Sequence, residues 1–205
     1  MRPVNDELAA KILTAAEAEF LSKGYRGASV RNIAASLGVT TGAIYRYYAG
    51  KEALFDALVK VHYDTVMNKF IGAQDRFETL PPENQRDNMG RISGDCMDWI
   101  TDYIYKNFNA FKLILSCSEG TKYEHMIHNM VETEVSATHK FAKSLEGLGY
   151  PKYEVDPRLE HMLCSGLFSA FFELVVHDIP YKKAKEYVSN LRDFYTAGWQ
   201  KIMGF

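Results

Sequence analysis

The amino-acid sequence predicts an all-α protein, because three features of the chain agree. Apolar residues recur at spacings of three and four along most of its 205 residues, as they do on the buried face of a helix. Glycine and proline interrupt this pattern at intervals that suit helices of ordinary length. No segment alternates apolar and polar residues over the length of a strand. A content of 47% hydrophobic and 24% charged residues fits a globular protein with ample material for a core.

The first helix is expected to begin near Asn5 or Asp6 and to end at Gly24, a residue that can close a helix in the left-handed conformation. The apolar stripe that this helix would bury consists of Leu8, Ile12, Leu13, Ala16 and Phe20.

Two short helices follow. Ser29 can cap a helix whose apolar positions run to Leu37, and Gly38 then allows a tight turn with positive φ. Thr40 or Thr41 can cap the next helix, over residues 41–48. Two short helices joined by a glycine turn form a helix-turn-helix, in which the second helix reads the major groove of DNA.

The outward positions of this second helix and of the turn before it carry hydroxyl, guanidinium and phenol groups, which suit contacts to phosphates and bases. The expected DNA-contacting residues there are Thr40, Thr41, Gly42, Tyr45, Arg46 and Tyr47. Ile44 and Tyr48 are expected to face inward. Lys51 follows where the chain leaves the groove, and a contact with a phosphate is expected.

Further helices are expected along the rest of the chain. The fourth would start at Lys51 and run towards Ile71, and Pro81-Pro82 would break the chain within the polar segment 74–87. Later helical segments are expected at residues 89–105, 110–117, 122–148, 156–176 and 181–203.

Residues 6–57 resemble the DNA-binding domain of the TetR family of bacterial transcriptional regulators. The resemblance rests on Gly24-Tyr25, Ser29 to Ala34, Leu37-Gly38-Val39, Gly42 to Tyr48 and Lys51 to Phe55. It implies a three-helix DNA-binding domain at residues 1–50 and a helical effector-binding and dimerisation domain at 51–205. Arg31 matches a family position that reaches the groove. Gly50 departs from the family pattern, in which a bulkier polar residue is common at this position.

The resemblance also implies a homodimer formed through the last two helices, which would place two recognition helices on a palindromic double-stranded operator. Small residues around Gly166 and an apolar stripe through Leu191 and Phe194 fit such an interface. The alternative is that these two helices pack against each other and their neighbours within one monomer.

A set of aromatic and sulfur-containing residues in the middle of the chain suggests an apolar cavity for a small-molecule effector, itself largely apolar or aromatic. The candidate lining residues are Trp99, Tyr103, Phe111, Cys117, Tyr123, Met126 and Phe168, with His125 as a further polar anchor. The alternative is that these residues are simply core.

Two histidines lie three residues apart, His125 and His128, with Glu124 and Glu132 near them on the expected helix. Such a pair offers imidazole and carboxylate groups to a metal, but two-ligand pairs on one helix are common by chance. We interpret this segment as a solvated helix face, and neither a metal nor a cofactor is expected.

Together these features favour a ligand-responsive repressor that binds its operator as a homodimer and is released by a small molecule. An alternative is a regulator without an effector, controlled by a partner protein or by thiol oxidation. An enzyme is a remote alternative. Cys117, His125 and Glu124 could supply a nucleophile and a base, but no GxSxG, P-loop or HExxH motif is present.

The expected location is the cytoplasm, without membrane insertion. The first ten residues lack the apolar region of a signal peptide, and the most apolar stretch, Leu167–Val176, is too short to cross a bilayer. The three cysteines are odd in number and widely spaced, which suits reduced thiols.

Overall fold

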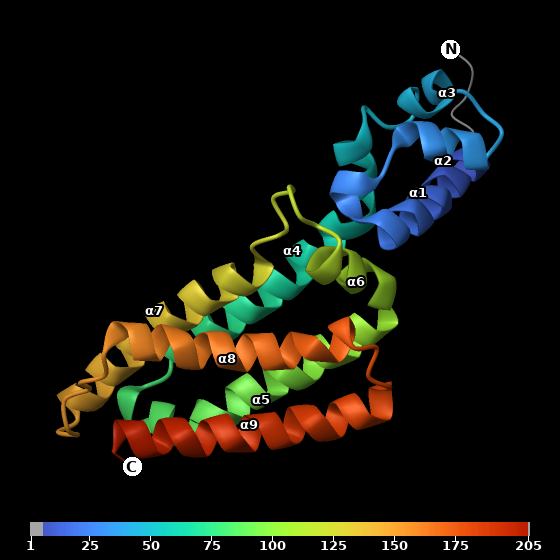
Figure 1. Cartoon of the computed structure of the whole chain (residues 1–205). Coiled ribbons are helices and arrows are strands. Elements are labelled where there is room, and N and C mark those ends of the chain that lie inside the picture. Colours follow the sequence, from blue (N-terminus) through green and yellow to red (C-terminus); the bar gives the residue numbers. More distant parts are fainter. Residues whose placement is uncertain (1–5, 205) are drawn as a thin grey trace. The chain divides into compact units, whose positions relative to one another are not determined.

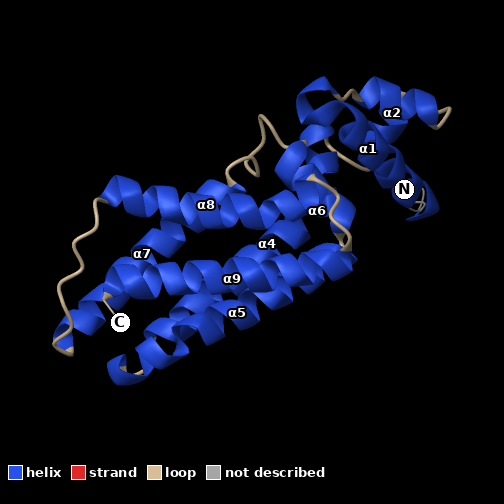
Figure 2. Ribbon diagram, turned by 60° about the horizontal axis from the view of Figure 1, so that its bottom comes forward, coloured by secondary structure: helices blue, strands red, loops and turns tan. Residues whose placement is uncertain are grey.

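The computed structural model of the chain describes residues 6–204, and these residues form helices and no strand (Figure 1, Figure 2). The all-α fold class is thus confirmed. The helices are α1 (Asp6–Gly27), α2 (Val30–Ser36), α3 (Thr41–Tyr45), α4 (Lys51–Glu78), α5 (Pro82–Lys106), α6 (Phe108–Ser116), α7 (Met126–Gly147), α8 (Pro157–Val176) and α9 (Tyr181–Met203). Asn5, one of the two expected starting points of α1, lies outside the described residues.

The described residues pack into two compact units. The amino-terminal unit comprises the residues up to Asp64 together with Asn107–Glu124. The carboxy-terminal unit comprises Thr65–Lys106 and the residues from His125 onward. The sequence analysis divides the chain at residue 50, whereas the packing divides it within α4 and assigns α6 to the amino-terminal unit, because α6 packs on α1.

The helix-turn-helix of the amino-terminal unit forms as its sequence predicts. The Ser29 hydroxyl accepts a hydrogen bond from the backbone N–H of Arg31 at 3.2 Å, and the Thr40 hydroxyl accepts one from Ala43 at 3.2 Å. Gly38 has φ of 65°, which a residue with a Cβ rarely adopts. Helix α3 ends at Tyr45, three residues earlier than expected, and the chain turns towards α4.

Helix α1 is interrupted at Gly24 rather than ended there. Gly24 has φ of 66° and ψ of 168°, so the helical path breaks, and a last turn then continues to Gly27. The carbonyl groups exposed by this break need partners, since unpaired polar groups at a helix end are costly.

Lys51 supplies them from the start of α4. Its ammonium group donates hydrogen bonds to the carbonyl oxygens of Tyr25 at 2.7 Å, Ala28 at 3.2 Å and Arg26 at 3.3 Å. The same ammonium lies 4.5 Å from the centre of the Tyr25 ring. A lysine has three N–H donors, so all of them are used within the unit. Lys51 therefore ties α4 to the end of α1.

In the carboxy-terminal unit, α7 lies beside α8 and α5 beside α9 (Figure 1). Helix α4 runs to Glu78, beyond the expected Ile71, and α5 begins at Pro82, seven residues before the expected Met89. The buried amide of Gln85 donates to the carbonyls of Glu78 at 3.2 Å and Leu80 at 3.1 Å, which satisfies the end of α4. The expected polar break is therefore only a short turn.

Helix α7 starts at Met126, not at Lys122, because residues 117–125 form turns instead. Helix α9 begins and ends as predicted, and α8 begins at Pro157, one residue after the predicted start. Asp156 caps α8 through the backbone N–H of Arg158, and Pro180 precedes α9.

Helix α8 packs one face into the core of the carboxy-terminal unit. Among the described helices it is the one long and apolar enough to cross a membrane by length and composition, with a mean hydropathy of 1.4. Its carboxylate Glu160 is fully buried, 2.6 Å from His139 Nε2, and it accepts a hydrogen bond from the Tyr153 hydroxyl at 3.1 Å. A charged group satisfied in this way is typical of a helix packed inside a protein.

We predict that replacing Lys51 with Met destabilises the protein by about 1–2 kcal/mol, because three carbonyls lose their donor and two of these hydrogen bonds are partly buried. Urea unfolding measures this effect. The matched control is Lys60→Met, which removes an exposed ammonium paired with Asp64 one turn away on the same helix. That change should cost less than about 0.5 kcal/mol. Equal losses for the two variants would contradict the structural role of Lys51.

Candidate nucleic-acid interface and ligand cavity

Helix α3 is anchored by one side chain and presents the others to solvent. Ile44 is completely buried, as expected, and Tyr48 is half-buried. Burial raises the pKa of the Tyr48 hydroxyl. On the other side of α3, Tyr45 exposes 54% of its surface, and Arg46 is exposed as well. An aromatic ring and a guanidinium side by side on an exposed helix suit contacts with DNA.

The other residues expected at the interface also lie on or beside α2 and α3. Arg31, Thr40 and Gly42 are exposed, and Thr41 and Tyr47 are half-buried. No described side chain forms an ion pair with Arg31, so its guanidinium is not committed to a protein carboxylate. Lys51 differs from these residues, since its ammonium faces the carbonyls at the end of α1.

Glu19 of α1 positions the helix-turn-helix. Its Oε1 atom accepts hydrogen bonds from the Asn32 amide at 2.9 Å, the Ser29 backbone N–H at 3.2 Å and the Lys23 ammonium at 3.3 Å. The hydrogen bond from Asn32 contributes most to lowering the pKa of this carboxyl. The sequence does not indicate this role, because Ser29 and Asn32 lie 10 and 13 positions after Glu19 and meet it only in the folded unit.

Residues 107–124 dock on the same unit through polar contacts to α1 and α4. Asp56 accepts hydrogen bonds from the Tyr123 hydroxyl and the Lys122 ammonium, both at 2.8 Å. The backbone N–H of Tyr25 donates to the carbonyl of Cys117 at 2.7 Å. Burial and the neighbouring Asp56 carboxylate raise the pKa of Tyr123.

Three of the residues expected to line a ligand cavity are thus buried in the amino-terminal unit, namely Phe111, Cys117 and Tyr123. Three others belong to the carboxy-terminal unit but do not line its apolar cavity, which is described below. Trp99 and Tyr103 stack on each other with ring centres 5.2 Å apart, and Met126 is buried.

An apolar cavity of the carboxy-terminal unit has a volume of about 120 Å³. Its wall is formed by helices α4, α5, α7, α8 and α9. Of the residues expected to line a ligand cavity, Phe168 lies in this wall. Its apolar lining consists of Phe70, Ala73, Phe77, Met89, Ile92, Met97, Ala137, Phe141, Leu167, Phe168, Trp199 and Met203. Aromatic rings from four helices surround one space, as is typical of a ligand site.

Two polar side chains meet at this cavity. The amide of Gln74 on α4 donates to Glu134 Oε2 on α7 at 2.6 Å. Burial raises the pKa of Glu134 to about 7, against the opposing effect of the Gln74 hydrogen bond. Near neutral pH this carboxyl group can therefore either donate or accept a hydrogen bond. Arg192 and Tyr195 line the cavity from α9.

A second hollow of about 430 Å³ adjoins the cavity and shares Gln74, Phe77, Ala137 and Phe141 with it. Its further lining includes Lys140 and Lys143 of α7. The apolar cavity and these two lysine side chains are therefore neighbours in the carboxy-terminal unit.

The three thiols are poor candidates for reactive sites. Cys96, Cys117 and Cys164 are all buried, and no disulfide joins them. Burial raises the pKa of Cys96 to about 11 and that of Cys164 to about 12, and it raises the pKa of Cys117 as well. Since the thiolate is the nucleophile, protonated and buried thiols react slowly with oxidants.

Comparison with known proteins agrees with this architecture. Residues 12–58 match the model of the family described as bacterial regulatory proteins, tetR family. No curated protein matches the chain.

Several solved structures share the fold across most of the chain. They include a TetR-like transcriptional regulator from Rhodococcus sp. RHA1 (16% identity, 100% of both chains, TM-score 0.53). The TetR-family transcriptional regulator PfmR from Thermus thermophilus has 16% identity, with 90% of this chain and 93% of that one covered and a TM-score of 0.53. The transcriptional regulator FadR from Bacillus subtilis, solved in complex with stearoyl-CoA, has 15% identity, with 93% and 98% covered and a TM-score of 0.55.

These similarities extend over both units, whereas the family match covers the helix-turn-helix and the start of α4. Residues 12–58 form the amino-terminal domain of the tetR family, and the chain has the fold of the transcriptional regulators of that family.

Proposed function

We propose that this protein is a ligand-responsive repressor that binds a palindromic operator as a homodimer and leaves it when a small molecule enters the carboxy-terminal unit. The observation that carries the proposal is α3, a helix held by the buried Ile44 with Tyr45 and Arg46 exposed beside each other. Gly42 adds a surface without a side chain, where a DNA backbone can approach. Thr40, Thr41, Tyr47 and Arg31 extend this surface.

Lys51 enters the proposal in a different role. Its ammonium group already serves three carbonyls, so we assign it to holding α1 and α4 together, while a phosphate contact would have to compete with those bonds. An enzyme is not favoured, because the cavity holds a single carboxyl–amide pair and the buried thiols are protonated.

The homodimer is supported by apolar side chains that α8 and α9 leave exposed. Met162 exposes 68% of its surface and Phe194 exposes 73%. Ser169 and Ala170, also exposed on α8, would let a partner helix come close. Gly166 serves contact within the chain instead, since a Cβ there would lie 2.6 Å from the Tyr195 hydroxyl. Further exposed apolar residues on these helices are Leu159, Val176, Tyr181, Tyr187 and Ile202.

The effector is proposed to be largely apolar or aromatic, with a polar group that meets Glu134 and Gln74. The apolar lining and the bound stearoyl-CoA of the Bacillus subtilis FadR structure support this class. A volume of about 120 Å³ is below the usual size of ligand sites, roughly 300–1,000 Å³. A larger ligand would have to displace helices of the cavity wall, and this displacement would supply the coupling to DNA binding.

For DNA binding, we predict that Arg46→Ala weakens binding to a selected operator by about 1–3 kcal/mol if Arg46 pairs with a base. If Arg46 contacts a phosphate, the loss should be similar on all sequences, with a salt dependence lower by about one unit of slope. Titrations on selected and random duplexes distinguish these cases. Lys60→Ala, an exposed change on α4, is the control. The assignment of α3 fails if a Tyr45→Ala, Arg46→Ala double variant binds as the parent does.

For assembly, we predict that the parent is a dimer at micromolar concentration and that Phe194→Glu makes it monomeric, because a carboxylate would be buried unpaired at the interface. Analytical ultracentrifugation measures this, and the monomer should lose affinity for a palindromic duplex. The control is Ile71→Glu, which adds the same charge to an exposed apolar position on α4. A parent protein that sediments as a monomer would rule out the interface.

For the effector, we predict that apolar compounds that raise the melting temperature also release the operator, since coupling between two sites is reciprocal. Ala137→Phe, which fills the cavity from α7, should abolish both effects while leaving operator binding intact. The control is Ser136→Phe, at the neighbouring exposed position on the same helix. Unchanged compound binding by the cavity-filling variant would place the effector site elsewhere.

For Glu134, a raised pKa means that the folded state holds the proton more tightly than the unfolded state. Protonation of Glu134 therefore stabilises the folded state. This contribution to stability is complete below about pH 4.5 and disappears as the pH rises through about 7. Glu134→Gln should therefore raise the melting temperature relative to the parent at pH 8, by roughly 2–4 °C for about 1 kcal/mol, and not at pH 4.5. Glu186→Gln, on the exposed side of α9, should show no such dependence. An equal difference in melting temperature between variant and parent at both pH values would contradict the raised pKa of Glu134.

A further inference from the structure

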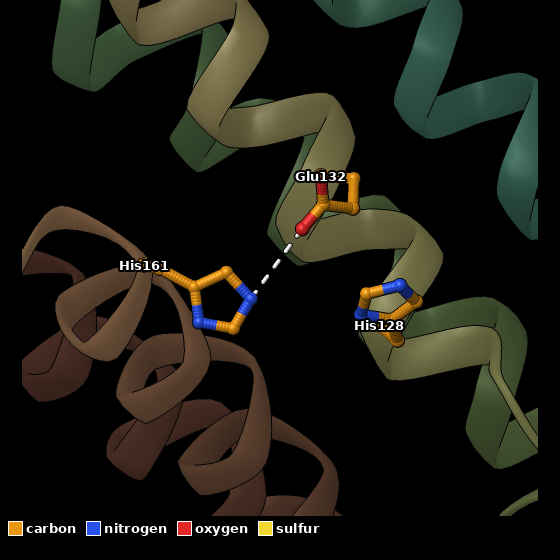
Figure 3. Close-up of side chains that lie close together, drawn as sticks. All are labelled: His128, Glu132 and His161. Carbon is orange, nitrogen blue, oxygen red and sulfur yellow. Dashed lines mark ion pairs between the residues drawn. The ribbon is translucent and has the colours of Figure 1, made fainter. Parts of the chain in front are cut away.

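Three side chains capable of binding a metal meet on the exposed side of the helix pair α7 and α8. His128 and Glu132 lie one turn apart on α7, and His161 comes from α8 (Figure 3). One nitrogen or oxygen atom of each lies within 4.8 Å of the others. His161 Nε2 is 3.4 Å from Glu132 Oε1, and the rings of His128 and His161 have centres 6.4 Å apart.

The spacing fits a tetrahedral zinc ion. Zinc bonds of about 2.0–2.2 Å to nitrogen and oxygen place neighbouring ligand atoms about 3.3–3.6 Å apart at the tetrahedral angle. The pair formed by His161 and Glu132 already has this separation. His128 is exposed, so a rotation about its side-chain bonds can bring its nitrogen closer at little cost. Water would supply the fourth ligand.

A second hydrogen bond orients His161 for this role. Its Nδ1 atom lies 3.3 Å from the Ser165 hydroxyl, one turn further along α8. An imidazole that carries its proton on Nδ1 can donate it to this hydroxyl, and its Nε2 lone pair then points to the side of Glu132. Metal-binding histidines commonly have such a partner on the second nitrogen.

Other histidines of the carboxy-terminal unit lack this combination. His177 pairs with Glu173 one turn away on α8 without a third ligand, and His139 pairs with the buried Glu160. Among the described residues, His128, Glu132 and His161 form the one group of three such ligands. A set of two imidazoles and one carboxylate favours zinc, whereas magnesium and calcium favour sites made of oxygen ligands.

We propose that this protein binds one zinc ion per chain through His128, Glu132 and His161, and that the ion clips α7 to α8. The sequence analysis interpreted the α7 part of this site as a solvated face, because the third ligand lies on a different helix. The site is exposed, so the ion exchanges with solvent. The proposal is independent of the proposed repressor function.

The test is a titration of the full-length, metal-free protein with zinc chloride against a chromophoric chelator. One zinc ion per chain is expected, together with a rise in melting temperature that EDTA reverses. His161→Ala and His128→Ala should each weaken zinc binding at least tenfold. Magnesium chloride at the same concentration should cause no such rise.

The matched control is His177→Ala, which removes an exposed histidine from a similar His–Glu pair on α8. This variant should bind zinc as the parent does. Binding that is absent in the parent, or unchanged in His161→Ala, overturns the proposal. Binding that falls equally in His161→Ala and His177→Ala also overturns it, because zinc would then be held by histidines in general. All three positions are exposed, and circular dichroism verifies that the variants fold.

Discussion

The docking of residues 107–124 on α1 and α4 is the contact on which the organisation of this protein depends. Asp56 receives two hydrogen bonds, from Tyr123 and Lys122, and Tyr25 is bonded through its backbone to Cys117. Together with the packing of α6 on α1, these bonds join residues 107–124 to the amino-terminal unit, although they lie in the middle of the chain. The chain consequently passes between the two units at three places, namely within α4, after Lys106 and after Glu124.

This connectivity has a consequence for regulation. Helix α4 carries Lys51 and Asp56 in the amino-terminal unit and Phe70, Gln74 and Phe77 at the cavity of the carboxy-terminal unit. In the proposed mechanism, a displacement of the cavity wall would reach the helix-turn-helix through α4, because this helix contributes residues to both units. The bonds of Lys51 to the end of α1 and of Glu19 to the start of α2 would then move the recognition helix with its unit.

Two carboxyl groups of the carboxy-terminal unit differ in how fully their hydrogen bonds are satisfied. Glu160 is fully buried with His139 and Tyr153 as partners, which fixes α8 against α7 and the segment between them. Glu134 has a single partner, the Gln74 amide, and a pKa of about 7. A carboxyl group that can still form hydrogen bonds beside an apolar cavity is suited to binding a ligand. A carboxyl group whose hydrogen bonds are all made within the protein is suited to stabilising the fold.

Local sequence signals were sufficient for the helices and for the DNA-binding motif. The hydroxyl caps Ser29 and Thr40, the positive φ of Gly38 and the apolar periodicity act over a few residues, so they can be recognised without the fold. The same holds for the limits of α8 and α9, where Asp156 and Pro180 stand at the start. The ends of α4 and α5 differ from the prediction, because the buried Gln85 amide satisfies the carbonyls of Glu78 and Leu80 across a short turn.

The proposed ligand sites depend on contacts between segments far apart in the chain, which the sequence alone does not reveal. Aromatic residues such as Phe111 and Tyr123 have the same periodicity whether they line a cavity or fill a core, and only the packing of α6 on α1 separates the two cases. His161 could not be paired with His128 and Glu132 for the same reason. Helical periodicity shows which face of a helix is buried, but it does not show which helix lies opposite.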